Sequence, residues 1–366
     1  MKRVLMVSCE GLGNGGVQSV MMSIVRNLHD EFSFDALLFT SEKRYYDEEF
    51  LSYGGKIIRI PNYEGKSRIR KRLDYYIRGY SLYKNAKKLF HKNNQYQIVH
   101  CNNYFECGPI LKAAAECGIP VRVAHCHNVA TKGENRHIFR NVLNTFYKKM
   151  IKKNASFLLA CSQAAGKYLF DDANFKIINN AIDLTKFDAK RFPYYKGKLQ
   201  FVHVGRYCFQ KNQLFLLDVF KYILKYYPNA ELKLIGFGVD EIEVQNKIQR
   251  ENLQNNVEML PQDSDVPLIL SNSFATIYPS TYEGLGISLI EAQAMGLRCY
   301  VSEAIQPEAD LGSCVHLNLI WGPQKWADII CNDIKKNGIR RYFVDLSSYD
   351  IATVSEFYRS IYNSKN

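Results

Sequence analysis

Short apolar runs alternate with segments of helical periodicity along the first half of the chain. The run KRVLMVSC (2–9) is followed by VQSVMMSIVRNL (17–28), in which apolar residues recur every three or four positions. Continuous Val, Ile and Leu runs that alternate with helices are typical of parallel strands covered on both faces. Further apolar runs occupy 32–39, 55–60, 96–101, 120–126 and 155–162, and helical patterns occupy 68–90, 107–118 and 137–153.

The alternation starts again after 181–199, an irregular stretch that we interpret as a linker. A length of 366 residues, at about 150 per domain, also suggests two domains. The pattern therefore predicts an α/β protein with two Rossmann-like domains and parallel sheets, the first at 1–184 and the second at 185–349. The apolar runs of the second half are 199–205, 230–236, 257–260, 274–279 and 298–302, with helical patterns at 212–227 and 286–296.

Charge divides the two halves. Residues 1–180 contain 28 Lys and Arg against 15 Asp and Glu, a net charge of +13, whereas residues 181–366 contain 20 against 21, a net charge of −1. A basic domain attracts phosphates, nucleic acid or an anionic membrane surface. No recognisable nucleic-acid-binding module accompanies the charge, so we do not expect a nucleic-acid partner.

The basic charge is densest at 66–92, which contains ten Lys and Arg and a single acid, Asp74, with Tyr and Phe residues interleaved. A helix of this composition suits an anionic membrane surface. A second cluster, Lys148, Lys149, Lys152 and Lys153, ends another predicted helix of the same domain. The alternative is a solvated helix face whose aromatic residues lie in the core.

Cysteine usage and hydropathy indicate the compartment. The ten cysteines form no C-x-x-C pair, so zinc and thioredoxin-type sites have no support and we expect reduced core thiols. The apolar run Val4–Val7 is too short for a secretory signal, and no stretch approaches the roughly 20 apolar residues of a spanning helix. We expect a cytoplasmic protein, peripheral on the inner face of the membrane.

The stretch YPSTYEGLGISLIEAQAMGL (278–297) carries the strongest chemical pattern. A strand ends there, a turn follows, and Gly284 and Gly286 precede a predicted helix. Glu283 stands in the turn and Glu291 lies eight positions later in the helix. A helix N-terminus binds phosphate through its free N–H groups, and glycines allow close approach. Two carboxylates around it suit the hydroxyls of two sugars, although spacing alone also fits a helix-start charge and a solvated residue.

The stretch FVHVGRYCFQKN (201–212) places two cations after a strand. Gly205 and Arg206 follow the strand, and Lys211 stands at the start of the next helix. Two cations at a strand end suit a diphosphate that becomes a leaving group. The alternative is a pair of exposed surface cations.

The glycines at the start of the chain allow a competing interpretation. Gly11, Gly13 and Gly16 fit G-x-G-x-x-G, which is typical of dinucleotide-binding turns. That fold needs an acid at the end of the second strand. Asp35 lies inside its predicted strand and Glu42 comes late, so the sequence argues against a dehydrogenase.

Taken together, these motifs resemble the retaining glycosyltransferases of the GT-B fold, family 4, of the type found in bacterial capsule and exopolysaccharide synthesis. Glu283 and Glu291 match the family's E-x7-E element, and Gly205, Arg206 and Lys211 match G-R-x4-K. The first loop GGVQ (15–18), VAHCHN with His127, and NNAID (179–183) also match in order. The resemblance implies two Rossmann-like domains facing a central cleft, and a C-terminal helix at 350–366 that crosses back to the first domain.

The resemblance also implies roles for residues. Arg206 and Lys211 would neutralise the departing diphosphate. Glu291 would hold the ribose hydroxyls, and Glu283 would contact the donor sugar together with the backbone near Leu285 and Gly286. His127 would face the donor sugar from the other domain and counts with Glu283, Arg206 and Lys211 as a catalytic candidate. The other donor contacts would come from Gly15, Gly16, Gly205 and Gly284. Family members are thought to use front-face attack without a protein nucleophile, so none is assigned.

The implied substrates are a nucleotide sugar, with UDP as the first expectation for the nucleotide, and a lipid-linked glycan acceptor. No cofactor or metal is expected; Asp263-Ser264-Asp265 spells D-x-D, but a helix cap is the better interpretation of these acids. His100 and His125, at strand ends, are expected to be buried structural residues. Two further readings stay open: a GT-B sugar-nucleotide epimerase, and an inactive membrane-bound partner subunit of a transferase.

Overall fold

The computed structural model describes residues 1–8, 11–60, 68–92, 95–102, 105–127, 129, 138–192, 199–283 and 285–364, with side chains except at 68–77 and 138–139. The chain forms two compact units. The first comprises Met1–Ala181 together with Ile351–Asn366, and the second comprises Ile182–Asp350. The predicted boundaries at 184/185 and 349/350 lie within three residues of these.

The first unit is built on a parallel sheet with the strand order β3-β2-β1-β4-β5-β6-β7. The central strand β1 is almost entirely buried, which explains its unbroken apolar run. The strands are β1 (Lys2–Ser8), β2 (Phe32–Leu38), β3 (Ile57–Arg59), β4 (Tyr96–Cys101), β5 (Val121–Cys126), β6 (Phe157–Ala160) and β7 (Lys176–Ile177).

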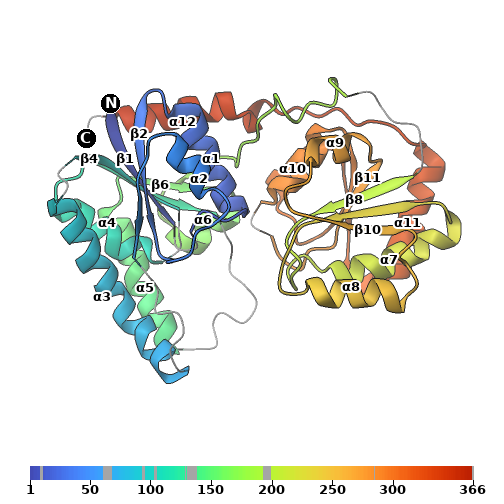
Figure 1. Ribbon diagram of the computed structural model, residues 1–366, viewed down its shortest axis with the longest axis horizontal. Coiled ribbons are helices and arrows are strands. Elements are labelled where there is room, and N and C mark those ends of the chain that lie inside the picture. The colour runs from blue at the N-terminus through green and yellow to red at the C-terminus, as the bar shows by residue number, and fades with distance from the viewer. Residues whose placement is uncertain are drawn as a thin grey trace. The chain divides into compact units, whose positions relative to one another are not determined.

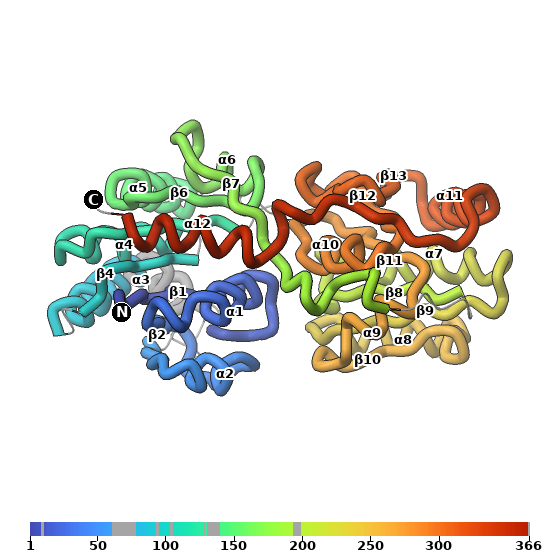
Figure 2. The backbone as a smooth tube through the Cα atoms, turned by 90° about the horizontal axis from the view of Figure 1, so that it is seen from above, coloured from blue at the N-terminus to red at the C-terminus, as the bar shows by residue number. Residues whose placement is uncertain are grey.

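Helices cover both faces of this sheet. In Figures 1 and 2, α1 and α12 lie on one side and α3, α4 and α5 on the other, as right-handed crossovers require when the strand order runs outward in both directions from β1. The helices are α1 (Gly16–Leu28), α2 (Asp47–Ser52), α3 (Arg68–Lys92), α4 (Cys107–Glu116), α5 (Ile138–Asn154), α6 (Gln163–Phe170) and α12 (Ile351–Asn363).

The last helix, α12, completes the first unit. It packs against α1 and buries Tyr358 and Tyr362. The Tyr362 ring meets Phe32 edge-on with ring centroids 5.3 Å apart, and Arg359 forms an ion pair with Glu31 at 2.7 Å. The apolar face of α12 therefore packs in the core of the first unit.

The second unit contains a parallel sheet of order β10-β9-β8-β11-β12-β13. Its core gathers Phe201, Leu217, Phe220, Leu232 and Trp326. The strands are β8 (Gln200–Val204), β9 (Glu231–Ile235), β10 (Val257–Leu260), β11 (Ala275–Tyr278), β12 (Arg298–Ser302) and β13 (Cys314–Leu317). The helices are α7 (Gln213–Tyr226), α8 (Glu241–Arg250), α9 (Val266–Ser271), α10 (Ile287–Ala294) and α11 (Gly322–Asn337), with short 3-10 turns η2 (Pro307–Ala309), η3 (Leu319–Trp321) and η4 (Ser347–Tyr349).

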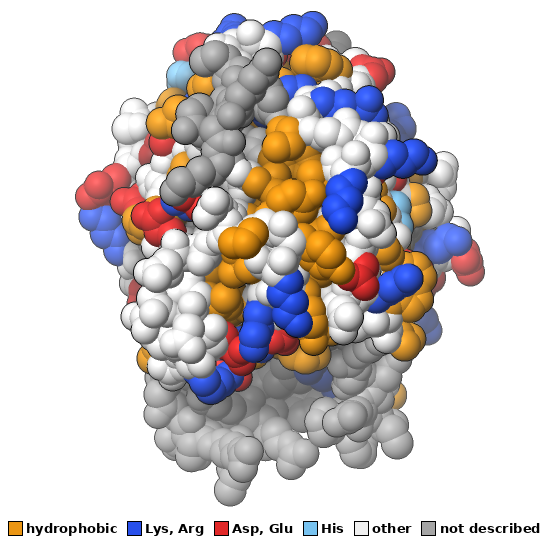
Figure 3. All heavy atoms as spheres, turned by 90° about the vertical axis from the view of Figure 1, so that its right-hand side faces the viewer, with side chains coloured by type: hydrophobic (Ala, Val, Ile, Leu, Met, Phe, Trp, Pro, Cys, Tyr) orange, Lys and Arg blue, Asp and Glu red, His pale blue; other side chains and the backbone are white. Residues whose placement is uncertain are grey.

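One face of the second unit shows a band of hydrophobic side chains bordered by lysines and arginines (Figure 3). More than half of an ordinary protein surface is apolar. The presence of this band is therefore not enough to infer a binding partner.

Candidate active site

The site in the second unit lies where its strand order reverses. The chain passes from β8 to β9 on one side, and β11 lies on the other side of β8. Ligands of open parallel sheets bind beyond the carboxyl ends of strands at such a switch point. The loops after β8 and β11 carry Arg206, Lys211 and Glu283, three of the residues that the sequence predicted.

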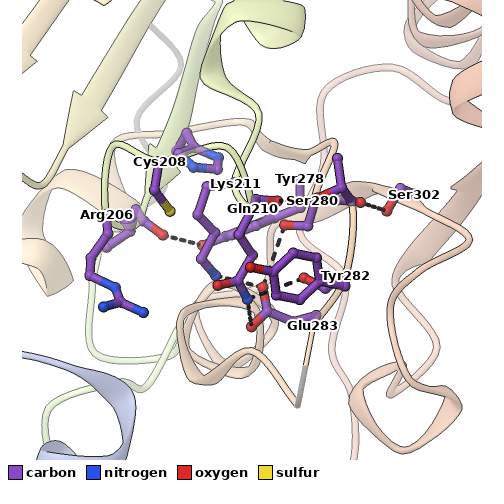
Figure 4. A network of polar contacts seen from close by, with 12 residues as sticks. Arg206, Cys208, Gln210, Lys211, Tyr278, Ser280, Tyr282, Glu283 and Ser302 are labelled. Atoms are coloured by element: carbon purple, nitrogen blue, oxygen red, sulfur yellow. Dashed lines mark hydrogen bonds and ion pairs between the residues drawn. The ribbon is translucent and has the colours of Figure 1, made fainter. Parts of the chain in front are cut away.

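The structure brings Lys211 and Glu283 into direct contact (Figure 4). The Lys211 ammonium donates to Glu283 Oε2 at 2.7 Å, and only 12% and 9% of the two side chains are exposed. Gln210 Nε2 lies 3.4 Å from Glu283 Oε1, and Ser280 Oγ lies 3.4 Å from Oε2. Glu283 is thus a carboxylate held by several donors in a nearly dry setting, where charge interactions are stronger than in water.

Further hydrogen bonds hold the two loops together. Thr281 N donates to Gln210 O at 2.8 Å, and Asn212 Nδ2 donates to Pro279 O at 3.1 Å. Gln306 Nε2 donates to the backbone oxygen of Glu283 at 3.2 Å. The loops therefore form one preorganised element. Sequence reasoning missed Gln210 and Gln306, because their role depends on which loops meet.

Glycines permit the close packing around this pair. Gly286 caps α10 with a φ of +84°, a conformation that L side chains rarely adopt. A Cβ on Gly205 would lie 3.3 Å from Lys211 Cε. Leu285 is buried, and Gly284 lies outside the described residues. The first N–H groups of α10 lack intrahelical partners, as at any helix start, and suit an anion.

Arg206 differs from Lys211 in its surroundings. Its side chain is exposed and extends away from the Lys211–Glu283 pair (Figure 4). Within the described part of the chain, no carboxylate pairs with its guanidinium. Arg206 is therefore a cation available to an incoming anion, whereas Lys211 is already bonded.

Glu291 lies on α10 in a partly buried position. Burial raises the pKa of its carboxyl to about 7. No hydrogen-bond donor of the described residues reaches its side-chain oxygens. A desolvated carboxyl without donors suits hydroxyl groups that a ligand would bring.

A buried histidine, His203, takes part in the hydrogen bonds that hold the loop after β8. His203 Nδ1 in β8 donates to Ile277 O at 2.9 Å, and its Nε2 lies 3.3 Å from Gln213 Nε2, which also donates to the backbone oxygen of Arg206 at 2.8 Å. Burial lowers the pKa of His203 to about 4. Neither His203 nor Gln213 was predicted, because a polar residue inside a strand or at the first position of a helix gives no signal of its partners.

The other predicted residues belong to the first unit. Gly15 is the N-cap of α1 with an extended backbone, and Gly16 begins the helix. His127 follows β5 and is 6% exposed. Both of its ring nitrogens have partners: Nε2 lies 3.1 Å from Asn102 Oδ1, and Nδ1 lies 3.3 Å from Asn180 Oδ1. Burial lowers the pKa of His127 to about 4.

His127 stands at the end of a buried stack of histidines. Its ring centroid lies 3.9 Å from that of His125, whose Nδ1 is 3.3 Å from His100 Nε2. His100 Nδ1 lies 2.7 Å from the Tyr362 hydroxyl of α12. Neither His100 nor His125 is exposed, so their predicted burial is confirmed.

Two acids that the sequence left open have structural partners. Asp35 is buried, accepts from Lys56 N at 2.9 Å and from the Tyr96 hydroxyl at 2.8 Å, and pairs with Arg3. A carboxylate so occupied does not suit the ribose of a dinucleotide. Asp265 is the N-cap of α9 and accepts from Leu268 N at 3.1 Å, which confirms the capping interpretation.

Comparison with known proteins decides the family. Residues 14–186 match the model of Glycosyltransferase Family 4, and residues 185–311 match that of Glycosyl transferases group 1. The chain belongs to the family 4 glycosyltransferases. The glycosyltransferase EpsF of Bacillus subtilis is 29% identical to it over 360 residues, covering 94% of this chain and 90% of EpsF.

Two further relatives resemble this glycosyltransferase. The capsular polysaccharide biosynthesis glycosyltransferase CapH of Staphylococcus aureus is 26% identical, covering 97% of each chain. The Escherichia coli enzyme named UDP-Gal:alpha-D-GlcNAc-diphosphoundecaprenol alpha-1,3-galactosyltransferase is 28% identical over 239 residues, covering 61% of this chain and 60% of its own.

The fold of the glycosyltransferase matches solved structures. HepE of Anabaena in complex with UDP and glucose superposes with a TM-score of 0.78 at 16% identity, over 100% of both chains. The two sheets with their helices are thus the GT-B arrangement that the sequence predicted. Among the helices of the described residues, none combines the length and apolar character needed to cross a bilayer.

Proposed function

We propose that this glycosyltransferase transfers a hexose from a UDP-sugar to a lipid-linked glycan acceptor, with retention, in capsular or exopolysaccharide synthesis. The similarity to EpsF and to the capsular polysaccharide enzyme CapH supports the pathway class. The UDP bound to HepE supports the nucleotide, and the diphosphoundecaprenol named for the E. coli enzyme supports the lipid-linked acceptor. The E. coli product is α-linked, as UDP-galactose is, which favours retention. The observation that carries the proposal is the Lys211–Glu283 pair beside the start of α10.

In this proposal the second unit holds the donor. The diphosphate lies against the first N–H groups of α10, near Gly286, with Lys211 and the exposed Arg206 around it. Glu291 accepts hydrogen bonds from the ribose hydroxyls, and Glu283 from a hydroxyl of the donor sugar. Donor binding then shares Lys211 between Glu283 and the leaving group.

The reaction exchanges one bond at the anomeric carbon. The bond from that carbon to the diphosphate oxygen breaks, and the acceptor oxygen bonds the same face. The acceptor proton passes to the departing phosphate oxygen, which takes the electron pair. Arg206 and Lys211 stabilise the charge that develops on the diphosphate, so most of the catalysis is electrostatic. We propose no metal, since these two cations supply the charge.

The membrane partner belongs to the same proposal. Gly79 of α3 lies against Tyr147 of α5, where an added Cβ would sit 1.8 Å from the Tyr147 hydroxyl oxygen, so the two helices pack closely. Figure 1 shows both helices extending past the end of the sheet. Next to this contact Tyr80, Val142 and Phe146 are 68%, 64% and 54% exposed.

The structure separates the cations of α3 and α5 into two groups. Lys87 of α3 bonds Glu116, which Lys112 of α4 also bonds, and Lys148 and Lys152 of α5 bond Asp171 at 2.8 Å. Five other lysines are exposed and have no carboxylate partner among the described residues: Lys84, Lys88, Lys92, Lys149 and Lys153. The side chains of 68–77, including Asp74, lie outside the described residues. We propose that the unpaired lysines and the exposed apolar residues contact an anionic bilayer, which would place the enzyme at the inner membrane face.

Product analysis tests the proposed reaction. Purified enzyme is incubated with UDP-hexoses and a diphosphate-linked sugar acceptor, and NMR of the product reports the anomeric configuration. An α-glycoside from an α-donor supports the proposal. An isomeric UDP-sugar formed without acceptor indicates an epimerase, and binding of donors without any turnover indicates an inactive partner subunit.

A further inference from the structure

The side chain of Gln213 bonds three groups around the loop after β8. This residue is the first of α7 and is 2% exposed. Its Nε2 donates to the backbone oxygen of Arg206 at 2.8 Å, and its Oε1 accepts from Cys208 N at 3.4 Å. A backbone oxygen only accepts and a backbone N–H only donates, so these two contacts fix the orientation of the amide. The second hydrogen of its NH2 group faces His203 Nε2 at 3.3 Å.

His203 is held in the tautomer that this contact requires. Its Nδ1 lies 2.9 Å from the backbone oxygen of Ile277, which only accepts, so Nδ1 carries a proton. The ring is fully buried beside Tyr278, with ring centroids 4.8 Å apart. Burial and the nearby Lys211 ammonium lower the pKa of the ring to about 4. Near neutral pH the ring therefore has a bare Nε2, which accepts the hydrogen bond from Gln213.

The loop after β9 bonds the same stretch of backbone. Tyr207 N donates to the backbone oxygen of Phe237 at 2.8 Å, and Gly205 N donates to Ile235 O at 3.0 Å. The residues on both sides of Arg206 are thus bonded, and its own backbone oxygen is bonded by Gln213. The Arg206 side chain is exposed. The direction in which its guanidinium leaves the loop is therefore set by groups that lie behind it.

We propose that Gln213 is a positioning residue, which holds the Arg206 backbone so that the guanidinium reaches the departing diphosphate. The inference rests on the proposed function, in which Arg206 stabilises the charge of that leaving group. Both ends of the Gln213 amide are bonded within the second unit, so this residue acts through Arg206. Its effect belongs to the transition state, where the charge on the diphosphate develops.

A double-mutant cycle tests whether Gln213 acts through Arg206. Gln213→Met keeps the length of the side chain and removes its donor and its acceptor. We expect it to lower kcat about tenfold in the wild-type background, because a misplaced catalytic group loses rate. In the Arg206→Ala background it should change kcat by less than about twofold, since the group through which it acts is gone.

Gln200→Met is the matched control for this cycle. Gln200 is the first residue of β8, at the end of the strand away from the loop, and its Nε2 donates to Ser273 Oγ at 2.9 Å. The same substitution there also removes the hydrogen bonds of a half-buried amide in the second unit. This variant should keep the wild-type kcat.

Long-range NMR of protein labelled with ¹⁵N at histidine tests the hydrogen bond itself. His203 is assigned by the loss of its signals in His203→Gln. We expect the Nδ1–H tautomer with a bare Nε2 in the wild type. Gln213→Glu keeps the size of the side chain and replaces the NH2 donor by a carboxylate, which accepts when ionised, so Nε2 should then carry a proton.

The outcomes separate the inference from the proposed function. The inference is overturned if Gln213→Met lowers kcat by the same factor in both backgrounds, if it leaves the wild-type kcat unchanged, or if Nδ1 of wild-type His203 is bare. Where Gln213→Met does not fold, Gln213→Glu takes its place in the cycle. Absence of turnover in the wild type refutes the proposed function, on which the inference rests, while the NMR result still decides the tautomer of His203.

Discussion

Lys211 and Glu283 bond each other at 2.7 Å while about nine-tenths of each side chain is hidden from solvent. The two residues come from loops that follow different strands, β8 and β11. Removing either partner leaves the other charge buried without its counter-ion, which is far costlier than losing an exposed pair. The pair therefore contributes to the integrity of the site as well as to its chemistry.

The two predicted cations should respond differently to truncation. Lys211→Ala is expected to lower the free energy of unfolding by about 3 kcal/mol, since it strands Glu283, and to lower kcat. Arg206→Ala should lower kcat about a hundredfold with an unchanged Tm, because Arg206 is exposed. Thermal unfolding and steady-state kinetics on both variants check this. Equal losses of Tm in the two variants would contradict it, as would an unchanged kcat in Arg206→Ala.

Donor binding should depend on pH through Glu291. Its pKa is raised to about 7 in the free protein by burial. Ribose hydroxyls donate to the ionised carboxylate, so binding lowers the pKa and releases a proton near neutral pH. UDP affinity should therefore rise as the pH increases from 6 to 8. Calorimetry in buffers of different ionisation enthalpy measures the released proton, and Glu291→Gln should abolish both the release and the pH dependence.

The buried histidines should make the fold sensitive to acid. Burial lowers the pKa of His100 to about 3 and of His127 and His203 to about 4, and that of His125 well below its usual value. The unfolded chain takes up these protons from about pH 6.5 downward and the folded chain does not, so stability is present above that pH and falls below it. Each histidine costs about 1.4 kcal/mol per pH unit between 6.5 and its folded pKa.

Urea unfolding at pH 7.5, 6.5 and 5.5 measures this loss. His203→Gln should reduce the slope of stability against pH for the second unit. A stability that does not change between pH 7.5 and 5.5 would mean that the histidines titrate normally in the folded protein.

Binding to anionic membranes should depend on the lysines of α3 and α5 that have no carboxylate partner among the described residues. Replacing Lys84, Lys88, Lys149 and Lys153 by Gln should weaken binding to phosphatidylglycerol vesicles strongly, since each lysine near an anionic surface contributes about 1 kcal/mol. The matched control replaces four exposed lysines of the second unit, which changes the net charge equally: Lys225, Lys325, Lys335 and Lys336. Vesicle sedimentation compares the two. If both variants lose vesicle binding equally, the effect comes from net charge alone. If both variants bind vesicles as the wild type does, the proposed membrane contact is wrong.

Activity should survive chelation. Asp265 caps α9, and the residues described include no group of three or more His, Cys, Asp or Glu side chains able to hold a metal ion. We expect the same rate with and without EDTA. A loss that Mn²⁺ restores would make Asp263 and Asp265 candidate ligands again.

Much of the fold was predictable because its strands are buried on both faces. β1 and β11 read as unbroken apolar runs, and the helices around them show one apolar face. β7 was missed because it is two residues long and both are exposed, so burial leaves no pattern there. α11 was missed as well, although Trp326, Ala327, Ile330, Cys331 and Ile334 form one buried helical face.

The site was predictable in its residue types and not in its contacts. Spacing and resemblance pointed to Lys211 and Glu283, but their ion pair depends on how two loops pack. The same holds for the orientation of Asn102 beside His127, which β4 and β5 bring together from 25 positions apart. The paired and unpaired lysines of α3 and α5 look alike in the sequence, because Glu116 and Asp171 lie on other segments.

The chain leaves the first unit at Ala181 and returns to it at Ile351, and the two ends of the second unit are neighbours: Ile182 N donates to Tyr349 O at 2.9 Å. The second unit is thus an insertion with adjoining ends. During synthesis the first unit stays without α12 until the whole second unit has been made, because α12 is the last helix of the chain. A segment that enters and leaves the first unit at one point can be exchanged between relatives as a single piece, and under the proposed function such an exchange changes the donor specificity.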